Sequence, residues 1–264
     1  MSIRAENPAL VTGGSKGIGK AIAVAFAKEG TNVVICGRGE EALKEAAAEI
    51  EMLGGNVLAV QADLTKQSDV EHLVSSAIDR FKSIDILVNN AGIANGFDDF
   101  EALDIEAWQH IFDVNVFGTV RVTKAVIPFM KKAGFGRIIN ISSESGLQPD
   151  SFMPHYNASK AAIINFSKSL SKAYATQGIL ANTVSPAFIM TPMLENLLKD
   201  NAKQLNITYE ATQQFLKENR PHVEVKRPGT VDEAASAVVY LASEQAYFIN
   251  GVNLRVDGGS VASK

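Results

Sequence analysis

Short apolar runs alternate with helical patterns along almost the whole chain, and no other feature restricts its fold so strongly. The runs lie at 9–13, 31–37, 56–64, 84–92, 136–143, 179–186 and 251–259. The helical patterns lie between them, at about 17–30, 40–53, 67–81, 105–132, 156–176 and 231–243. Strands that are apolar throughout belong to a parallel sheet covered on both faces, and strand–helix–strand crossovers are right-handed. The alternation therefore predicts a doubly wound α/β fold of about seven parallel strands with helices on both faces.

The chain has 264 residues, and it shows neither a low-complexity linker nor a repeat beyond the strand–helix unit. These features predict a single domain over residues 1–264. The exception is a polar segment of helical propensity at about 190–228, which follows the carboxyl end of a strand. Because ligands bind outside those ends in open α/β sheets, we interpret the segment as a lid over a ligand site. A surface decoration is the alternative.

Charge and composition exclude several classes of protein. The formal net charge of −4 and the pI near 5.6 give no basic footprint for a nucleic acid. The single cysteine, Cys36, rules out an internal disulfide framework, suits a reducing compartment and lies in an apolar run where we expect a buried thiol. No apolar stretch is long enough to span a membrane, and the first ten residues do not resemble a signal peptide. We therefore expect a cytoplasmic protein with no membrane partner.

The glycine-rich stretch TGGSKGIGKA has two incompatible interpretations. A nucleoside-triphosphate P-loop would use Lys20 as its phosphate lysine, but it needs a Ser or Thr at the next position to hold magnesium, and Ala21 stands there. A dinucleotide turn needs glycines where the backbone turns tightly and approaches a pyrophosphate at a helix N-terminus. The glycines in question are Gly13, Gly17 and Gly19. The stretch therefore favours the dinucleotide turn.

Further motifs extend this interpretation along nearly the whole chain. They are ADL at 62–64, NNAG at 89–92, Asn115 in DVNVFG, Ser143 in ISSESG, YNASK at 156–160, SPAFIMT at 185–191 and VDGG at 256–259. Together with the glycine turn they resemble the short-chain dehydrogenase/reductase family in order and spacing. The resemblance implies a Rossmann fold and an oxidoreductase that uses a nicotinamide cofactor.

Tyr156 and Lys160 lie four residues apart on one helical pattern and therefore share a face. A free phenol has a pKa of about 10, and an ammonium within ~4–6 Å lowers it by about 1–3 units. Lys160 can thus tune Tyr156 as a proton donor or acceptor near neutral pH. Ser143 ends a buried strand and could stabilise charge on a substrate oxygen, whereas Ser142 would point the other way.

The resemblance completes this catalytic set with Asn115. It implies that Asn115 anchors a water molecule and Lys160 in a proton relay, and that Lys160 also holds the hydroxyls of the nicotinamide ribose. From the residues alone, a kink in the helix is the alternative role for Asn115. We expect no catalytic metal, because no histidines cluster at the spacing of metal ligands.

The resemblance also implies where the cofactor binds. The backbone of Ile189 and the hydroxyl of Thr191 would fix the carboxamide, Asp63 and Leu64 would flank the adenine, and the turn at 89–92 would flank the adenosine ribose. The full expected set is Gly13, Ser15, Lys16, Gly17, Ile18, Gly19, Arg38, Asp63, Leu64, Asn90, Ala91, Gly92, Tyr156, Lys160, Ile189 and Thr191. Ala187 departs from the family pattern, which usually has glycine at that position.

The choice of cofactor depends on the end of the second strand. NAD-preferring folds place an acidic side chain there, but this chain has Gly37 followed by Arg38. The glycine leaves space for a 2′-phosphate, and the guanidinium can bind that phosphate with two hydrogen bonds. Lys16 can reach the same group. The pattern predicts NADP(H) rather than NAD(H), and the alternative is that Arg38 and Lys16 are solvated surface charges.

The resulting hypothesis is an NADP(H)-dependent carbonyl reductase or alcohol dehydrogenase with a small-molecule substrate. The nearest subgroup resemblance is to 3-oxoacyl thioester reductases that use an acyl carrier protein, although NAD-dependent dehydrogenases of sugars, polyols and steroids share every motif. A non-catalytic dinucleotide sensor would be expected to lack Tyr156, Lys160 or Ser143. Candidate pocket residues are 93–97, Glu144, Ser145, Gln148, His155, Phe188 and Met193.

The helical pattern at 156–176 is apolar on more than one side. One row contains Ala158, Ala162, Phe166 and Leu170, and another contains Ala161 and Ile164. One side would cover the sheet and leave the other for a partner. The resemblance implies a homotetramer that pairs through this helix and the one at 105–132, with a second contact near the last strand.

Overall fold

The computed structural model describes residues 7–94, 100–208, 210–211, 214 and 223–262. Their strands form one parallel sheet in the order β3-β2-β1-β4-β5-β6-β7. The strands are β1 Ala9–Thr12, β2 Val33–Gly37, β3 Val57–Gln61, β4 Ile86–Asn89, β5 Gly136–Ile141, β6 Ile179–Pro186 and β7 Asn253–Val256. The seven-stranded parallel sheet predicted from the apolar runs is confirmed.

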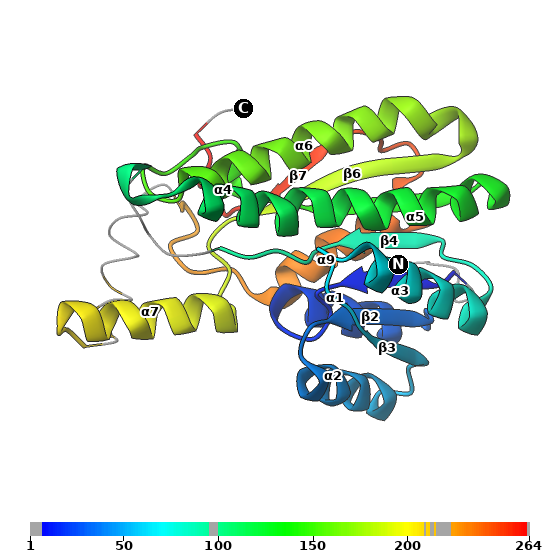
Figure 1. Ribbon diagram of the computed structural model, residues 1–264, viewed down its shortest axis with the longest axis horizontal. Coiled ribbons are helices and arrows are strands. Elements are labelled where there is room, and N and C mark those ends of the chain that lie inside the picture. The colour runs from blue at the N-terminus through cyan, green and yellow to red at the C-terminus, as the bar shows by residue number, and fades with distance from the viewer. Residues whose placement is uncertain (1–6, 95–99, 209, 212–213, 215–222, 263–264) are drawn as a thin grey trace.

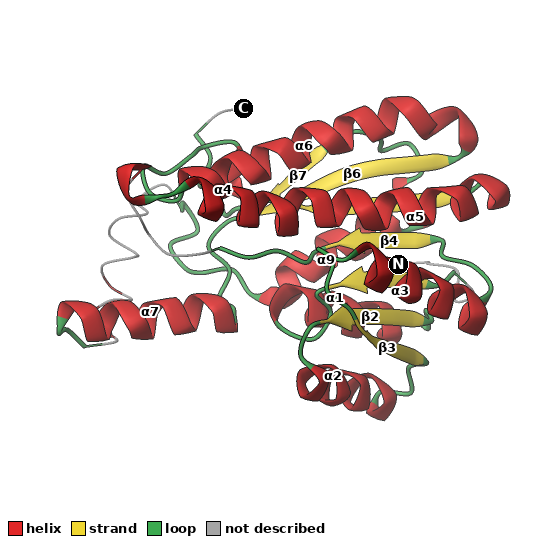
Figure 2. Cartoon of the chain, viewed as in Figure 1, coloured by secondary structure: helices red, strands yellow, loops and turns green. Residues whose placement is uncertain are grey.

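Helices cover both faces of the sheet (Figure 2). The helices are α1 Gly17–Lys28, α2 Glu40–Met52, α3 Gln67–Phe81, α4 Ile105–Phe112, α5 Gly118–Ala133, α6 Pro154–Tyr174, α7 Pro192–Leu205 and α9 Val231–Ala242. Buried residues of α1, α2 and α9 pack in one apolar cluster on one face, and those of α3, α5 and α6 pack in a second cluster on the other. This arrangement, with helices packed on both faces of one parallel sheet, is the doubly wound fold.

The helical pattern at 105–132 is not one regular helix. A π-helical turn, η2 at Asp113–Phe117, separates α4 from α5. Asn115 lies buried at its centre, and its side chain is bonded to the backbone of Ile93. A π turn inserts one extra residue into the helix and occurs mostly at functional sites. The turn therefore aims the Asn115 amide toward the loop that follows β4.

The segment predicted at 190–228 begins with α7, which Figure 1 shows at one end of the molecule. Thr191 caps this helix by accepting a hydrogen bond from the backbone N–H of Leu194 at 3.2 Å, and Pro192 occupies the first turn. Both are favourable helix starts. Residues 209, 212–213 and 215–222 of the predicted excursion lie outside the described part of the chain.

The sheet reverses its strand order at β1. β1 pairs with β2 on one side and β4 on the other, so the loops after β1 and β4 diverge at the carboxyl edge of the sheet. Such a switch point is where open α/β sheets bind their ligands. Among the described residues, no helix is long and apolar enough to cross a membrane.

Candidate active site

The turn after β1 requires its glycines. Gly13 and Gly17 have φ values of 65° and 56°, a conformation that residues with a Cβ rarely adopt. A Cβ on Gly19 would collide with the carbonyl oxygen of Gly13 and with the side chain of Asn90. The turn thus presents bare backbone and the first turn of α1, where amide N–H groups lack helical partners and favour an anion.

Thr12 joins the loops on either side of the switch point. Its hydroxyl accepts hydrogen bonds from the backbone N–H groups of Asn90 and Ala91, both at 3.0 Å, and donates to the carbonyl of Val88 at 3.3 Å. The Asn90 amide donates to the Thr12 carbonyl at 2.9 Å. Thr12 is not among the predicted site residues, although a polar residue that ends a buried strand beside the glycine turn was a usable signal.

The end of β2 lies against the glycine turn. A Cβ on Gly37 would sit 3.0 Å from the Ser15 hydroxyl oxygen, so a larger residue at 37 would press on the turn. Arg38 and Lys16 are both exposed at this edge. The side-chain amide of Gln61 donates to the Arg38 carbonyl at 2.8 Å and holds the loop to β3. Sequence reasoning did not single out Gln61.

Asp63 follows β3 close to this loop. Burial alone would raise the pKa of its carboxyl, but hydrogen bonds from the backbone and hydroxyl of Thr65, with the nearby charges of Lys66 and Arg38, hold that pKa below its usual value. Asp63 is therefore an anion within the field of Arg38. Its contact with an adenine stays a prediction.

Lys160 and Tyr156 lie together on α6. The ammonium nitrogen of Lys160 is 5.6 Å from the centre of the Tyr156 ring and donates to the Ile141 carbonyl at 3.1 Å. Lys160 is buried, and burial lowers its pKa to about 8. Tyr156 is half-buried. The helical spacing thus places a largely protonated amine beside a phenol that solvent can reach.

The two serines after β5 point into different surroundings. Ser142 is buried and donates its hydroxyl proton to the Lys160 carbonyl at 2.7 Å, which ties β5 to α6. Ser143 is half-buried, begins the short helix η3 Glu144–Gly146 and accepts a hydrogen bond from the Ser145 backbone. Ser143, rather than Ser142, therefore faces the accessible side, as the alternation of an extended strand predicts.

Asn115 and Lys160 meet at Gly92. A Cβ built on Gly92 would lie 3.2 Å from Asn115 Oδ1 and 3.3 Å from Lys160 Nζ. The Asn115 amide also donates to the Ser159 hydroxyl at 3.1 Å, and that hydroxyl donates to the Tyr156 carbonyl at 2.7 Å. Ser159, which the sequence analysis left without a role, links Asn115 to the helical turn of Tyr156. Its position inside YNASK was the available signal.

The loop after β6 closes the other side of the glycine turn. Ile189 pairs with Gly229 in an isolated bridge, and Thr191 lies 3.8 Å from where a Gly17 Cβ would be. Ala187, the departure from the family pattern, donates its backbone N–H to the Val256 carbonyl at 3.1 Å. The loop therefore stays attached to β7 without a glycine at 187.

The candidate pocket residues differ in their burial and contacts. Four of those with described side chains are buried: Glu144, Ser145, His155 and Phe188. Gln148 instead binds the C-terminal segment through its amide. Residues 95–97 and the side chain of Met193 lie outside the described part of the chain. No three His, Cys, Asp or Glu side chains come together as a metal site among the residues that are described.

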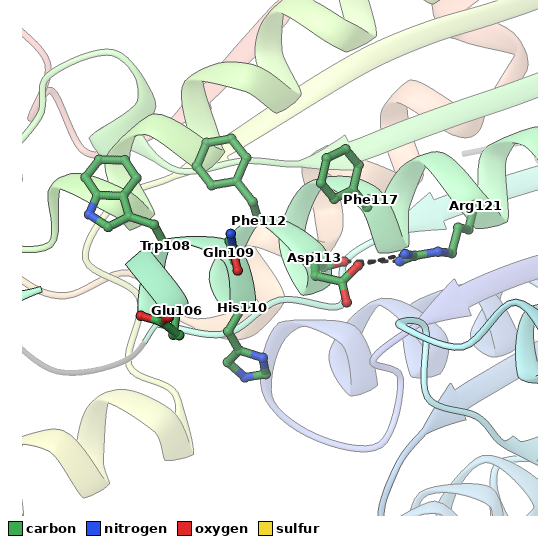
Figure 3. A pocket seen from close by; sticks show the side chains of 8 residues that line it. All are labelled: Glu106, Trp108, Gln109, His110, Phe112, Asp113, Phe117 and Arg121. Atoms are coloured by element: carbon green, nitrogen blue, oxygen red, sulfur yellow. Dashed lines mark hydrogen bonds and ion pairs between the residues drawn. The ribbon is translucent and has the colours of Figure 1, made fainter. Parts of the chain in front are cut away.

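A concavity of about 700 Å³ lies away from Tyr156, on the outer side of α4, η2 and the start of α5. Figure 3 shows its lining, including Trp108, Phe112 and Phe117, and the ion pair between Asp113 and Arg121 at 2.7 Å. A second groove of about 570 Å³ runs between α5 and α6. Neither concavity contains a residue of the predicted catalytic or cofactor set.

Comparison with known proteins agrees with this geometry. The family model described as short chain dehydrogenase matches residues 7–202. The 3-oxoacyl-[acyl-carrier-protein] reductase of Synechocystis sp. is 39% identical over 96% of this chain and 96% of its own length. The D-beta-hydroxybutyrate dehydrogenase of Rhizobium meliloti is 36% identical over 96% and 98%. The structure of L-sorbose reductase from Gluconobacter frateurii, complexed with NADPH and L-sorbose, matches with a TM-score of 0.92 at 34% identity, over 98% of this chain and 97% of that one.

Proposed function

This chain belongs to the short-chain dehydrogenase family, and we propose that it is an oxidoreductase that transfers a hydride between NADP(H) and a carbonyl or secondary alcohol. The observation that carries the proposal is the buried Lys160 ammonium, which lies 5.6 Å from the centre of the Tyr156 ring and close to Gly92 in the loop after β4. Ser143 follows Ser142, whose hydroxyl is bonded to the Lys160 carbonyl. A non-catalytic dinucleotide sensor has no need of this buried ammonium next to an accessible phenol.

A nicotinamide dinucleotide fits the residues that are present. The bare backbone at Gly13 and the N-terminus of α1 suit a pyrophosphate, and the loop at 189–191 lies across the same turn. We propose that Lys160 holds the nicotinamide ribose, and that Ile189 and Thr191 hold the carboxamide. When bound, the cofactor supplies or accepts the hydride.

The protein itself handles the proton. With a pKa of about 8, Lys160 is mostly an ammonium at neutral pH, and its charge favours the anionic form of the Tyr156 phenol. Tyr156 can therefore give a proton to the substrate oxygen during reduction and take it back during oxidation. The Ser143 hydroxyl hydrogen-bonds the same oxygen as charge develops on it. Asn115 supports the relay from beside Lys160.

We propose NADP(H) over NAD(H). Gly37 has no side chain, and it lies close to Ser15 of the glycine turn. Arg38 and Lys16 are exposed cations at the same edge. These observations support the preference. A 2′-phosphate there would meet two cations and no carboxylate at position 37. The sorbose reductase of similar structure was solved with NADPH, which favours the same cofactor here.

Two substrate classes have specific support. The Synechocystis relative reduces a 3-oxoacyl group on an acyl carrier protein, according to its name, and a thioester of this kind is our first candidate. The Rhizobium relative, a D-beta-hydroxybutyrate dehydrogenase by name, favours a small hydroxy acid such as 3-hydroxybutyrate. The distinguishing measurement is a spectrophotometric panel of acetoacetyl-coenzyme A, 3-hydroxybutyrate, sorbose and glucose against both cofactors.

We propose a homotetramer in the cytoplasm. The concavities over α4, α5 and α6 and the exposed aromatic residues beside β7 support the assembly. The single cysteine, Cys36, supports the compartment: one cysteine cannot form an internal disulfide, and this thiol is buried, which raises its pKa to about 12.

The first test removes the phenol oxygen. Tyr156→Phe deletes the proton-transfer group and leaves the ring, so we expect turnover to be abolished while cofactor binding, followed by fluorescence titration, stays nearly intact. Lys160→Ala damages both, because the residue has two roles. If Tyr156→Phe kept about a tenth or more of the wild-type kcat, the proposed proton transfer would be wrong.

A further inference from the structure

The loop after β5 and the segment after β7 meet across the carboxyl end of β6. β6 lies between β5 and β7 in the sheet, yet Gln148 from the first loop reaches the segment at 258–262. Its amide nitrogen donates to the Ser260 carbonyl at 3.4 Å, and its amide oxygen accepts from the Ala262 N–H at 3.1 Å. One side chain thus binds a donor and an acceptor of the same backbone.

The C-terminal segment is also fixed by its own contacts. The Asp257 carboxylate accepts hydrogen bonds from the N–H groups of Gly259 and Val261, both at 3.1 Å. Val261 is buried, as is Ser260. These bonds hold the backbone in the conformation that Gln148 contacts, so the segment is packed against the body rather than extended into solvent.

Gln148 connects this segment to the catalytic loop. Its backbone N–H donates to the Glu144 carbonyl at 2.9 Å, directly after Ser143. The same loop packs on the catalytic helix, because a Cβ on Gly146 would lie only 2.8 Å from the Lys160 carbonyl carbon. A displacement of Gln148 would therefore also displace Ser143, on the substrate side of the site.

We propose that the segment at 258–262 forms one wall of the substrate site and that Gln148 is the positioning residue that holds it there. The inference rests on the proposed function, since it takes Ser143 and Tyr156 to mark where the substrate reacts. The cofactor turn lies across the sheet at β1, β2 and β4, whereas the side-chain hydrogen bonds of Gln148 within the described part of the chain go to Ser260 and Ala262. The wall therefore acts on binding of the substrate and leaves binding of the cofactor unchanged.

The first experiment compares Gln148→Leu and Gln148→Glu in the full-length chain, with the best carbonyl substrate of the panel. Leucine removes both side-chain bonds, so KM for the carbonyl substrate rises about fivefold to tenfold, while kcat and the cofactor KM change by less than about twofold. Glutamate keeps the acceptor for the Ala262 N–H and gives an intermediate KM. Gln67→Leu, at an exposed position on α3, is the matched control and leaves all three constants unchanged.

The second experiment is a double-mutant cycle with a chain that lacks residues 260–264. If Gln148 acts through the segment, its substitution adds no further change in KM once the segment is gone. An equal effect of Gln148→Leu in both backgrounds overturns the proposal. So does an unchanged KM in the shortened chain. Thermal unfolding and cofactor titration on every variant show whether it has folded.

A third measurement does not depend on activity. Hydrogen exchange at the Ala262 amide speeds up in Gln148→Leu and stays slow in Gln148→Glu, because only glutamate retains the acceptor. Slow exchange in both variants would contradict the bond. A wild-type protein without carbonyl activity, or an active Tyr156→Phe variant, would instead overturn the proposed function, so the two failures are distinguishable.

Discussion

The Lys160 ammonium is buried where few groups stabilise its positive charge. Its side chain is buried, its described hydrogen-bond acceptor is the Ile141 carbonyl, and burial is the cause of its lowered pKa. No carboxylate forms an ion pair with it among the described residues. A buried cation without a counter-ion is a poor arrangement for stability. It suits a site where the charge acts on a neighbouring phenol.

This arrangement predicts a pH-dependent stability of the cofactor-free protein. Below pH 8 the folded and unfolded chains both hold the Lys160 proton, and the full cost of burying the charge is present. Between about 8 and 10.5 the unfolded chain binds more protons than the folded one, so stability rises with pH. Relative to Lys160→Met, the wild-type free energy of unfolding gains up to about 3 kcal/mol across this window.

Urea denaturation of both proteins at about pH 7 and about pH 9.5 measures the gain. Titrating groups away from Lys160 cancel, because the two chains differ at one residue, and repeating the comparison in a Tyr156→Phe background removes the contribution of the neighbouring phenol. If the unfolding free energies of the wild type and of Lys160→Met changed equally with pH, Lys160 would have the same pKa in the folded and unfolded chains.

The cofactor preference also depends on single residues. Gly37→Asp combined with Arg38→Leu introduces an anion and removes a cation where we expect the 2′-phosphate. A charge-assisted hydrogen bond contributes about 1.5–3 kcal/mol, so the ratio of kcat/KM for NADP(H) over NAD(H) should fall roughly 10- to 100-fold or reverse. Arg80→Leu, which removes an exposed arginine on α3, is the control. Equal kcat/KM values for the two cofactors in the wild-type protein would refute the preference.

At the scale of elements, the π turn between α4 and α5 depends on Asn115. The amide accepts from the Ile93 N–H at 2.8 Å and donates to the Ile93 carbonyl at 3.0 Å. Asn115→Leu keeps the size but leaves both backbone groups without this partner, at about 1–3 kcal/mol for each buried group. We expect a lower unfolding free energy in urea together with a lower kcat. Asn165→Leu, at an exposed site on α6, should change neither the unfolding free energy nor kcat. If Asn165→Leu lowered both as much as Asn115→Leu, the loss would come from helix propensity and not from the bonds to Ile93.

Elements that depend on a local repeat could be predicted from the sequence, and those that depend on distant partners could not. The seven strands followed from apolar runs, and the glycine turn followed from residues within one loop. The π turn arises because Asn115 bonds to Ile93, 22 residues earlier, and helical periodicity carries no trace of that bond. The contact between Gln148 and Ser260 spans 112 residues and joins two loops of unremarkable composition.

At the scale of the whole molecule, two apolar surfaces lie on different elements. The first covers α4, η2 and α5, where Phe117 is exposed in the concavity of Figure 3 and Phe129 is exposed further along α5. The second lies just before β7, where Tyr247, Phe248 and Val252 are exposed, with Phe248 fully so. Large exposed side chains that cluster on two surfaces suit an assembly with two kinds of contact.

Disrupting each of the two surfaces should leave a different oligomer. A carboxylate in an apolar interface loses its hydration without gaining a partner, so Phe117→Glu should break the helical contact and leave dimers joined near β7. Phe248→Glu should break the β7 contact and leave dimers joined through the helices, and the double variant should be a monomer. Met52→Glu, at an exposed position on α2 away from both surfaces, should remain a tetramer. Sedimentation velocity at micromolar concentration measures the wild type and the four variants; a monomeric wild type, or a tetrameric double variant, would show that these surfaces do not build the assembly.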